Sequence, residues 1–167
     1  MNAIFTRRTC RKFEDKPVPR EMIERVLRAA MQAPSGKDAR PWQFLVVTDP
    51  EKRTAISKTC DFSVSAAGAP VVILLLADFT REEKAGLWWV EALSAAAENM
   101  LIEAESDGLG AAWLGFWPVP ERIAYLRTLF ALPDHLEPFA AVTLGYKKRE
   151  KPAEDRYDPT LIHWETI

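Results

Sequence analysis

The chain has 167 residues, a formal net charge of −2 and 48% hydrophobic residues. This length and apolar share predict one folded domain with a substantial core, and they argue against a disordered chain. The small net charge argues against tight electrostatic binding to a nucleic acid or an acidic membrane. Two cysteines are too few for a disulfide framework or a metal knuckle, so we expect a reducing, cytoplasmic setting.

Neither a membrane span nor a secretory signal is expected. The longest apolar run, Val71 to Ala77, covers about a third of a bilayer. The first eight residues carry charge, but no apolar stretch follows them. Six tryptophans in so short a chain indicate that aromatic surface is needed at a pocket or an interface.

Apolar spacing and breaker residues predict helices and strands that alternate along the chain. Helices are expected at 3–8, 19–32, 50–58, 86–107 and 118–131, and strands at 42–48, 70–78, 111–114 and 139–146. No repeat or linker divides them, so the fold class is α/β or α+β. A basic turn, Arg7 to Phe13, is expected after the first helix. The charged segment after Lys147 ends in apolar residues that should dock on another surface.

The helix expected at 86–107 is apolar nearly all round, apart from a stripe at Glu91, Glu98 and Glu105. A helix of this kind is buried on most sides. Because a chain of this length has difficulty burying so long a helix all round, we suspect that a second subunit covers it. The glycine-rich stretch at 108–110 is expected to end the helix.

Common catalytic and nucleotide-binding motifs are incomplete. The pattern Gly108-x-Gly110 has Trp113 where the dinucleotide fingerprint needs glycine. Neither histidine has a partner at metal-ligand spacing, so no metal site is predicted. No nucleophilic triad or dyad is evident.

Three segments carry polar residues at places where the need for solubility does not explain them well. Arg7 to Arg11 brings three guanidiniums and a hydroxyl together, which suits a phosphate, although a solvated basic turn is the alternative. Pro34 to Trp42 is a loop that can aim backbone N–H groups at a ligand, or a plain connection. The third segment includes Asn99, in the middle of the apolar helix, and the glycine-rich stretch at 108–115. A buried asparagine needs hydrogen-bond partners, and the alternative to a ligand is that it caps a helix inside the core.

Together these segments resemble the FMN-dependent nitroreductase family over nearly the whole chain. The matching stretches are Arg-Arg-Thr-x-Arg from residue 7, Pro-Ser-Gly-x-x-x-x-Pro-Trp-x-Phe from 34, Ala-Pro-Val-Val-Ile from 69, Ala-Ala-x-Glu-Asn-Met-Leu from 95, Gly-Leu-Gly-x-x-Trp-Leu-Gly from 108, Leu-Gly-Tyr from 144 and Asp-Arg-Tyr-Asp from 155. The resemblance implies an α+β, nitroreductase-like fold: a central mixed, mostly antiparallel sheet flanked by helices, with the long helix at a homodimer interface. It implies one FMN-binding domain, residues 1–167, whose tail, 147–167, docks on the dimer.

The resemblance also implies two FMN sites at the dimer interface, each lined by both chains. The implied cofactor-binding residues are Arg7, Arg8, Thr9, Arg11 and Arg156 around the phosphate and the polar edge of the flavin, Pro34, Ser35, Gly36 and Asp38 from the other subunit, and Trp113, Leu114 and Gly115 along the isoalloxazine. No metal and no catalytic side chain are implied, because flavin N5 carries the chemistry.

The implied activity is a ping-pong oxidoreductase that passes hydride from NAD(P)H to a nitroaromatic, a quinone or a similar small acceptor. The alternatives are a flavin-binding or flavin-sensing dimer with little turnover, reductive dehalogenation, and flavin breakdown. The chain departs from the family at Asp38 and Arg40, where Asn and Gln are frequent. A carboxylate near the pyrimidine edge would disfavour an anionic reduced flavin unless Arg40 or Arg11 offsets it. Four tryptophans, at 42, 88, 89 and 117, are candidates for packing over the flavin or, alternatively, in the core or an interface.

Overall fold

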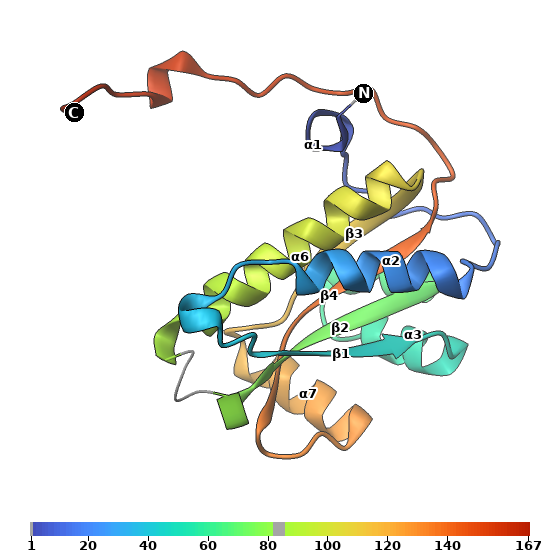
Figure 1. The fold of residues 1–167 in the computed structure, drawn as a ribbon. Coiled ribbons are helices and arrows are strands. Elements are labelled where there is room, and N and C mark those ends of the chain that lie inside the picture. Colours follow the sequence, from blue (N-terminus) through green and yellow to red (C-terminus); the bar gives the residue numbers. More distant parts are fainter. Residues whose placement is uncertain (1, 82–85) are drawn as a thin grey trace.

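Residues 2–81 and 86–167 are described by a computed structural model, in which helices cover both faces of a four-stranded sheet (Figure 1). The strands are β1 (Trp42–Val47), β2 (Val71–Asp78), β3 (Leu109–Gly115) and β4 (Leu136–Tyr146), in the spatial order β1-β2-β4-β3. The helices are α1 (Ala3–Thr6), α2 (Arg20–Met31), α3 (Pro50–Ser57), α4 (Ser65–Gly68), α6 (Trp89–Ser106) and α7 (Pro120–Phe130). Short 3₁₀ turns are η1 (Gly36–Asp38), η2 (Asp61–Ser63), η3 (Phe79–Arg81), η4 (Gly86–Trp88) and η5 (Pro159–Leu161).

The expected α+β class is confirmed, and every strand pairs with its neighbours in the antiparallel direction. Within the described ranges, parallel pairing is limited to an isolated bridge between Thr9 and Ala111. That bridge is the element that makes the pairing mixed. The predicted helices and strands are present, with ends displaced by a few residues.

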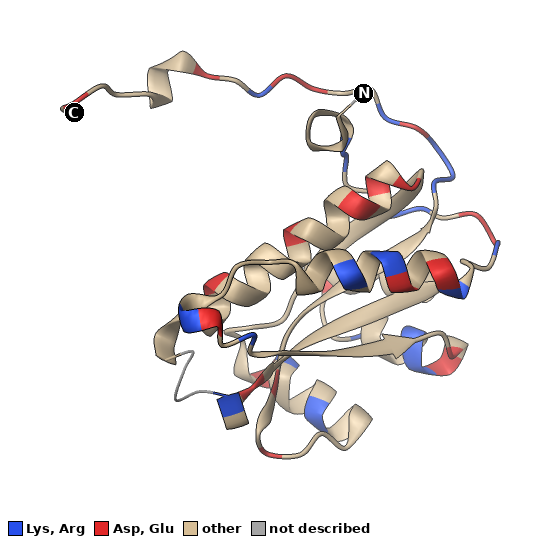
Figure 2. Cartoon of the chain, in the orientation of Figure 1, with Lys and Arg blue, Asp and Glu red and all other residues tan. Residues whose placement is uncertain are grey.

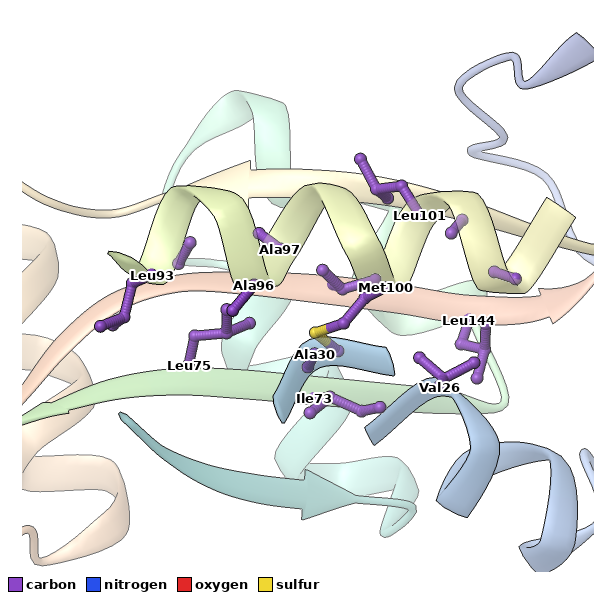
Figure 3. Packing of buried hydrophobic residues seen from close by; sticks show 14 of the residues in the cluster. Val26, Ala30, Ile73, Leu75, Leu93, Ala96, Ala97, Met100, Leu101 and Leu144 are labelled. Atoms are coloured by element: carbon purple, nitrogen blue, oxygen red, sulfur yellow. The ribbon is translucent and has the colours of Figure 1, made fainter. Parts of the chain in front are cut away.

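Strand β2 separates two hydrophobic cores, because all its residues are buried and successive side chains point to opposite faces. Ile73 and Leu75 pack in the core under α2 and α6, where Val26 and Met100 lie between the helices and the sheet (Figure 3). Leu74 packs on the other face in the core that α3 and α7 cover. A continuous apolar run therefore forms the central strand, as its composition predicts.

Helix α6 lies beside α2, and a polar side chain joins them. Asn99 donates a hydrogen bond of 3.0 Å from its amide to the carbonyl of Ala29 in the last turn of α2. It thus caps a helix inside the core. Gly108 follows α6 with φ +74°, the left-handed conformation that favours glycine, so it ends the helix as predicted.

The predicted turn at 7–13 is wrong, because no turn forms there and the segment instead makes isolated bridges, from Thr9 to Ala111 in β3 and from Phe13 to Lys147 just after β4. Paired glycines in these strands, Gly110 and Gly145, leave room for it. A Cβ on Gly110 would lie 2.6 Å from Cβ of Cys10, and one on Gly145 would lie 2.9 Å from Cδ1 of Phe13. Glycine here serves the close approach of neighbouring side chains, those of Cys10 and Lys147 at Gly110 and those of Pro70 and Phe13 at Gly145.

The tail runs away from the body of the protein, past the N-terminal end (Figure 1). Every residue from 148 to 167 is exposed, and Tyr157, Leu161 and Trp164 are 71%, 76% and 80% exposed. Its docking on a dimer stays a prediction. Among the described helices, none is long and apolar enough to cross a membrane.

Candidate functional site

Basic residues from the two ends of the chain come together beside the C-terminal half of α6 (Figure 2). The guanidinium of Arg8 donates a hydrogen bond of 2.7 Å to the carbonyl of Pro152. The ammonium of Lys151 donates one of 3.0 Å to the carbonyl of Thr9. The start of the tail therefore lies along the N-terminal segment, and the two segments form one cationic surface.

Two glutamates of the stripe on α6 pair with cations of this surface. Glu98 pairs with Arg7 at 3.2 Å. Glu105 pairs with Lys147 at 2.9 Å, with side chains only 13% and 11% exposed. Burial alone would lower the pKa of Lys147, but the hydrogen bond and charge of Glu105, with those of Glu150, raise it above its ordinary value. Lys147 therefore stays charged at neutral pH.

Two cavities flank Arg8. The smaller, of about 300 Å³, is lined by Thr9, Cys10 and Arg11 together with Lys147 and residues that follow it. Among the described residues, no partner for the side chain of Arg11 is found, so its donors are available to a ligand.

The larger cavity, of about 600 Å³, is lined by three guanidiniums and the chain around them. The arginines are Arg7, Arg8 and Arg156, and the carboxylate of Glu154 lies among them. Planar guanidiniums match phosphate oxygens with two donors each, so this donor set fits the phosphate of FMN. The described residues contain no group of three or more potential metal ligands.

The loop at 34–40 is held in an unusual conformation. Lys37, Asp38 and Arg40 have φ of +52°, +53° and +49°, which costs energy for side chains other than glycine. Arg40 grips Asp38 with two hydrogen bonds of 2.7 and 2.8 Å, and its N–H donates to Oγ of Ser35 at 3.0 Å. Asp38, the carboxylate whose charge would disfavour an anionic reduced flavin, is thus paired with Arg40.

Within one protomer this loop lies away from the arginines. A Cβ on Gly36 would be 3.0 Å from the ring of Trp88, just before α6, whereas Arg7 lies against Glu98. Ten residues of helix separate Trp88 from Glu98, or about 15 Å along the axis. Pro34 is the first residue of this loop. The assignment of the loop to the site of a second subunit stays a prediction.

Strand β3 leads from the arginines to Trp113, Leu114 and Gly115, the residues predicted to lie along the flavin ring. It leads from Ala111, the bridge partner of Thr9, to Gly115 four residues later, about 13 Å away. Leu114 is buried, whereas Gly115 is exposed and has open space where a Cβ would point. Trp113 packs edge-on against a phenylalanine ring at 5.9 Å. The strand spacing suits a ligand with a phosphate at one end and a ring at the other.

The four candidate tryptophans differ in exposure. Trp42 is buried in the core, and Trp89 contacts Trp117 edge-to-face at 5.3 Å. Trp88 and Trp117 are 48% and 38% exposed, so they retain surface for a ligand. Sequence reasoning missed Glu154, although its position two residues before Arg156 was a signal that a carboxylate would meet the arginines.

Comparison with known proteins assigns the family. The Nitroreductase family model matches residues 4–63 and 63–146. The chain belongs to the nitroreductase family. A relative from Methanothermobacter thermautotrophicus, provisionally named an NADH dehydrogenase/NAD(P)H nitroreductase, is 40% identical over 99% of this chain and 86% of its own length.

Solved structures agree with this assignment. An FMN-dependent nitroreductase from Clostridium difficile has a TM-score of 0.91 and 28% identity, covering 99% of both chains. A nitroreductase, provisionally so named, from Desulfovibrio desulfuricans was solved in complex with FMN; it has a TM-score of 0.81 and 30% identity over 99% of this chain and 95% of its own. The expectation of a nitroreductase-like fold is therefore confirmed.

Proposed function

We propose that this protein binds FMN and uses it to oxidise NAD(P)H and reduce a small acceptor, such as a nitroaromatic or a quinone. The observation that carries the proposal is the convergence of Arg7, Arg8 and Arg156 on one cavity from opposite ends of the chain. These arginines would hold FMN by its phosphate, and FMN would supply the hydride-transfer chemistry that links NAD(P)H to the acceptor. The two half-reactions would follow one another at one flavin face, which predicts ping-pong kinetics.

The residues of this chain would bind the cofactor and orient it. Arg7, Arg8 and Arg156 would hold the phosphate, and the cavity at Thr9 and Arg11 would receive the polar part of the cofactor. Arg11, which has no partner among the residues described, would donate hydrogen bonds to that polar part. The exposed backbone at the end of β3, around Gly115, would lie along the ring system.

We further propose a homodimer that completes each site. The loop at Pro34, Ser35, Gly36 and Asp38 lies beside Trp88, about 15 Å along α6 from the glutamate that pairs with Arg7, and it would serve the partner's site. The ion pair of Asp38 with Arg40 would keep that loop rigid and limit the charge presented to the flavin. The exposed apolar residues of the tail, 147–167, would dock on the second subunit.

The test begins with cofactor binding. Purified protein is titrated with FMN, whose fluorescence is quenched when it binds, and its mass is measured by analytical ultracentrifugation. We expect one FMN per chain and a dimer. Oxidation of NADH and of NADPH is then followed by absorbance, with and without a quinone or a nitrofuran, and we expect the acceptor to accelerate it.

Each result has a distinct meaning. FMN binding without oxidation of either nicotinamide would favour a flavin-binding or flavin-sensing protein. Protein that takes up no FMN would refute the proposed function. A monomer that binds FMN fully would refute the two-chain site.

A further inference from the structure

One carboxylate oxygen lies between two of the arginines assigned to the phosphate. Oε2 of Glu154 is 3.2 Å from a terminal nitrogen of Arg8 and 3.2 Å from a terminal nitrogen of Arg156. A single oxygen shared by two guanidiniums is the arrangement that a phosphate oxygen would adopt there. Glu154 therefore presents to this cavity the same chemistry as the ligand that the cavity fits.

The side chains of this bridge differ in exposure and in their other contacts. The side chain of Arg8 is 28% exposed and is also held by the carbonyl of Pro152 at 2.7 Å. Glu154 and Arg156 lie in the extended tail and are 52% and 63% exposed. Arg8 can thus stay in place while Glu154 turns into solvent, because the contact with Pro152 does not depend on that carboxylate.

We propose that Glu154 is an internal anion that occupies the phosphate position in the cofactor-free protein and leaves it when the phosphate binds. This inference rests on the proposed function. A carboxylate and a dianionic phosphate repel one another and compete for the same donors, so both cannot use them fully. Before the phosphate binds, Glu154 would neutralise the charge of Arg8 and Arg156, and the cost of breaking these two ion pairs would weaken cofactor binding.

A structural role predicts the opposite. If Glu154 only oriented the arginines and stayed beside them, its loss would disorder the site and weaken phosphate binding. The two interpretations therefore predict opposite changes in FMN affinity for Glu154→Gln. This substitution keeps the size of the side chain and removes its charge.

The experiment compares FMN with riboflavin, which lacks the phosphate. Dissociation constants are measured by fluorescence quenching on the full-length protein for wild type, Glu154→Gln and Asp155→Asn. Asp155 is the matched control, since it lines the same cavity and accepts a hydrogen bond from the N–H of Tyr157. No ion pair joins it to an arginine among the described residues.

We expect Glu154→Gln to bind FMN about 3- to 10-fold more tightly, because two partly exposed ion pairs no longer have to be broken. Riboflavin affinity should stay the same, and Asp155→Asn should change FMN affinity by less than about twofold. Unchanged or weaker FMN binding by Glu154→Gln would overturn the proposal. So would an equal gain in Asp155→Asn or in riboflavin binding, since either would indicate a general change in charge.

Failure of this inference is separable from failure of the proposed function. Wild-type protein that binds neither FMN nor riboflavin would refute the function itself. Wild-type protein that binds FMN, with Glu154→Gln no better, would refute only the role of Glu154.

Discussion

The substitution Gly110→Ala tests whether close approach at β3 positions the cationic surface. The added Cβ would lie 2.6 Å from Cβ and 2.7 Å from Sγ of Cys10, and 2.8 Å from Cγ of Lys147. Carbon atoms pack at about 3.5–4.0 Å, so the N-terminal segment would have to move by about 1 Å. That movement would lengthen the hydrogen bond of 2.8 Å from the N–H of Cys10 to the carbonyl of Ala111.

The cost combines overpacking, about 1–3 kcal/mol, with the loss of one hydrogen bond, about 1 kcal/mol. We therefore expect Gly110→Ala to lower the free energy of unfolding by about 2–4 kcal/mol and the melting temperature by roughly 5–15 °C. Chemical denaturation and calorimetry measure both. FMN affinity should fall as well, because Arg8 and Arg11 are attached to the displaced segment.

Gly115→Ala is the matched control in the same strand. Nothing lies within 4 Å of the added Cβ, so the melting temperature should be unchanged or slightly higher. If the flavin ring lies along this end of β3, the new methyl should nevertheless weaken FMN binding by about 1–3 kcal/mol. Equal melting temperatures for wild type and Gly110→Ala would refute the packing argument. Full FMN affinity in Gly115→Ala would refute the placement of the ring.

Arg7→Ala and Arg156→Ala should each weaken FMN binding by about 1.5–3 kcal/mol in a fluorescence titration, and unchanged affinity in both would remove the phosphate assignment. Asn99→Ala should lower the free energy of unfolding by about 1 kcal/mol, since the carbonyl of Ala29 loses its amide donor; an unchanged denaturation midpoint would contradict this. Burial would raise the pKa of Asp78, but hydrogen bonds from Gln43 and Thr80 and the charge of Arg81 lower it overall. Asp78→Asn should therefore be less stable by about 2 kcal/mol at pH 7, in urea denaturation. This difference should shrink as the pH falls below the ordinary pKa of 3.8 and through the lower folded value, where wild type loses the contribution; a gap that stays constant would contradict it.

Periodicity and composition predicted the elements well because their signals are local. The run from Val71 to Ala77 is apolar throughout, which is typical of a strand covered on both faces. The path of residues 7–13 was predicted wrongly, because it depends on a gap that Gly110 and Gly145 create about 100 or more residues away. Pro138 likewise hid the start of β4, since it sits where the β2–β4 register shifts and proline is tolerated at such irregularities.

The site could be predicted as a set of residue types but not as an arrangement. Clustered arginines indicated an anion, and the glutamate stripe on α6 was visible in the sequence. That Glu98 holds Arg7 and Glu105 holds Lys147 depends on how the helix packs between the two termini. The bridge made by Glu154 depends on the path of an extended tail, for which no periodic pattern exists.

The contact of Arg8 with Pro152 joins two segments that are 144 residues apart in the sequence, and Glu154 lies two residues beyond Pro152. The sheet does not need this contact in order to form, whereas the anion site is incomplete until both segments are in place. A ligand bound at this junction would therefore stabilise only molecules in which both segments have docked, by mass action on that folded state.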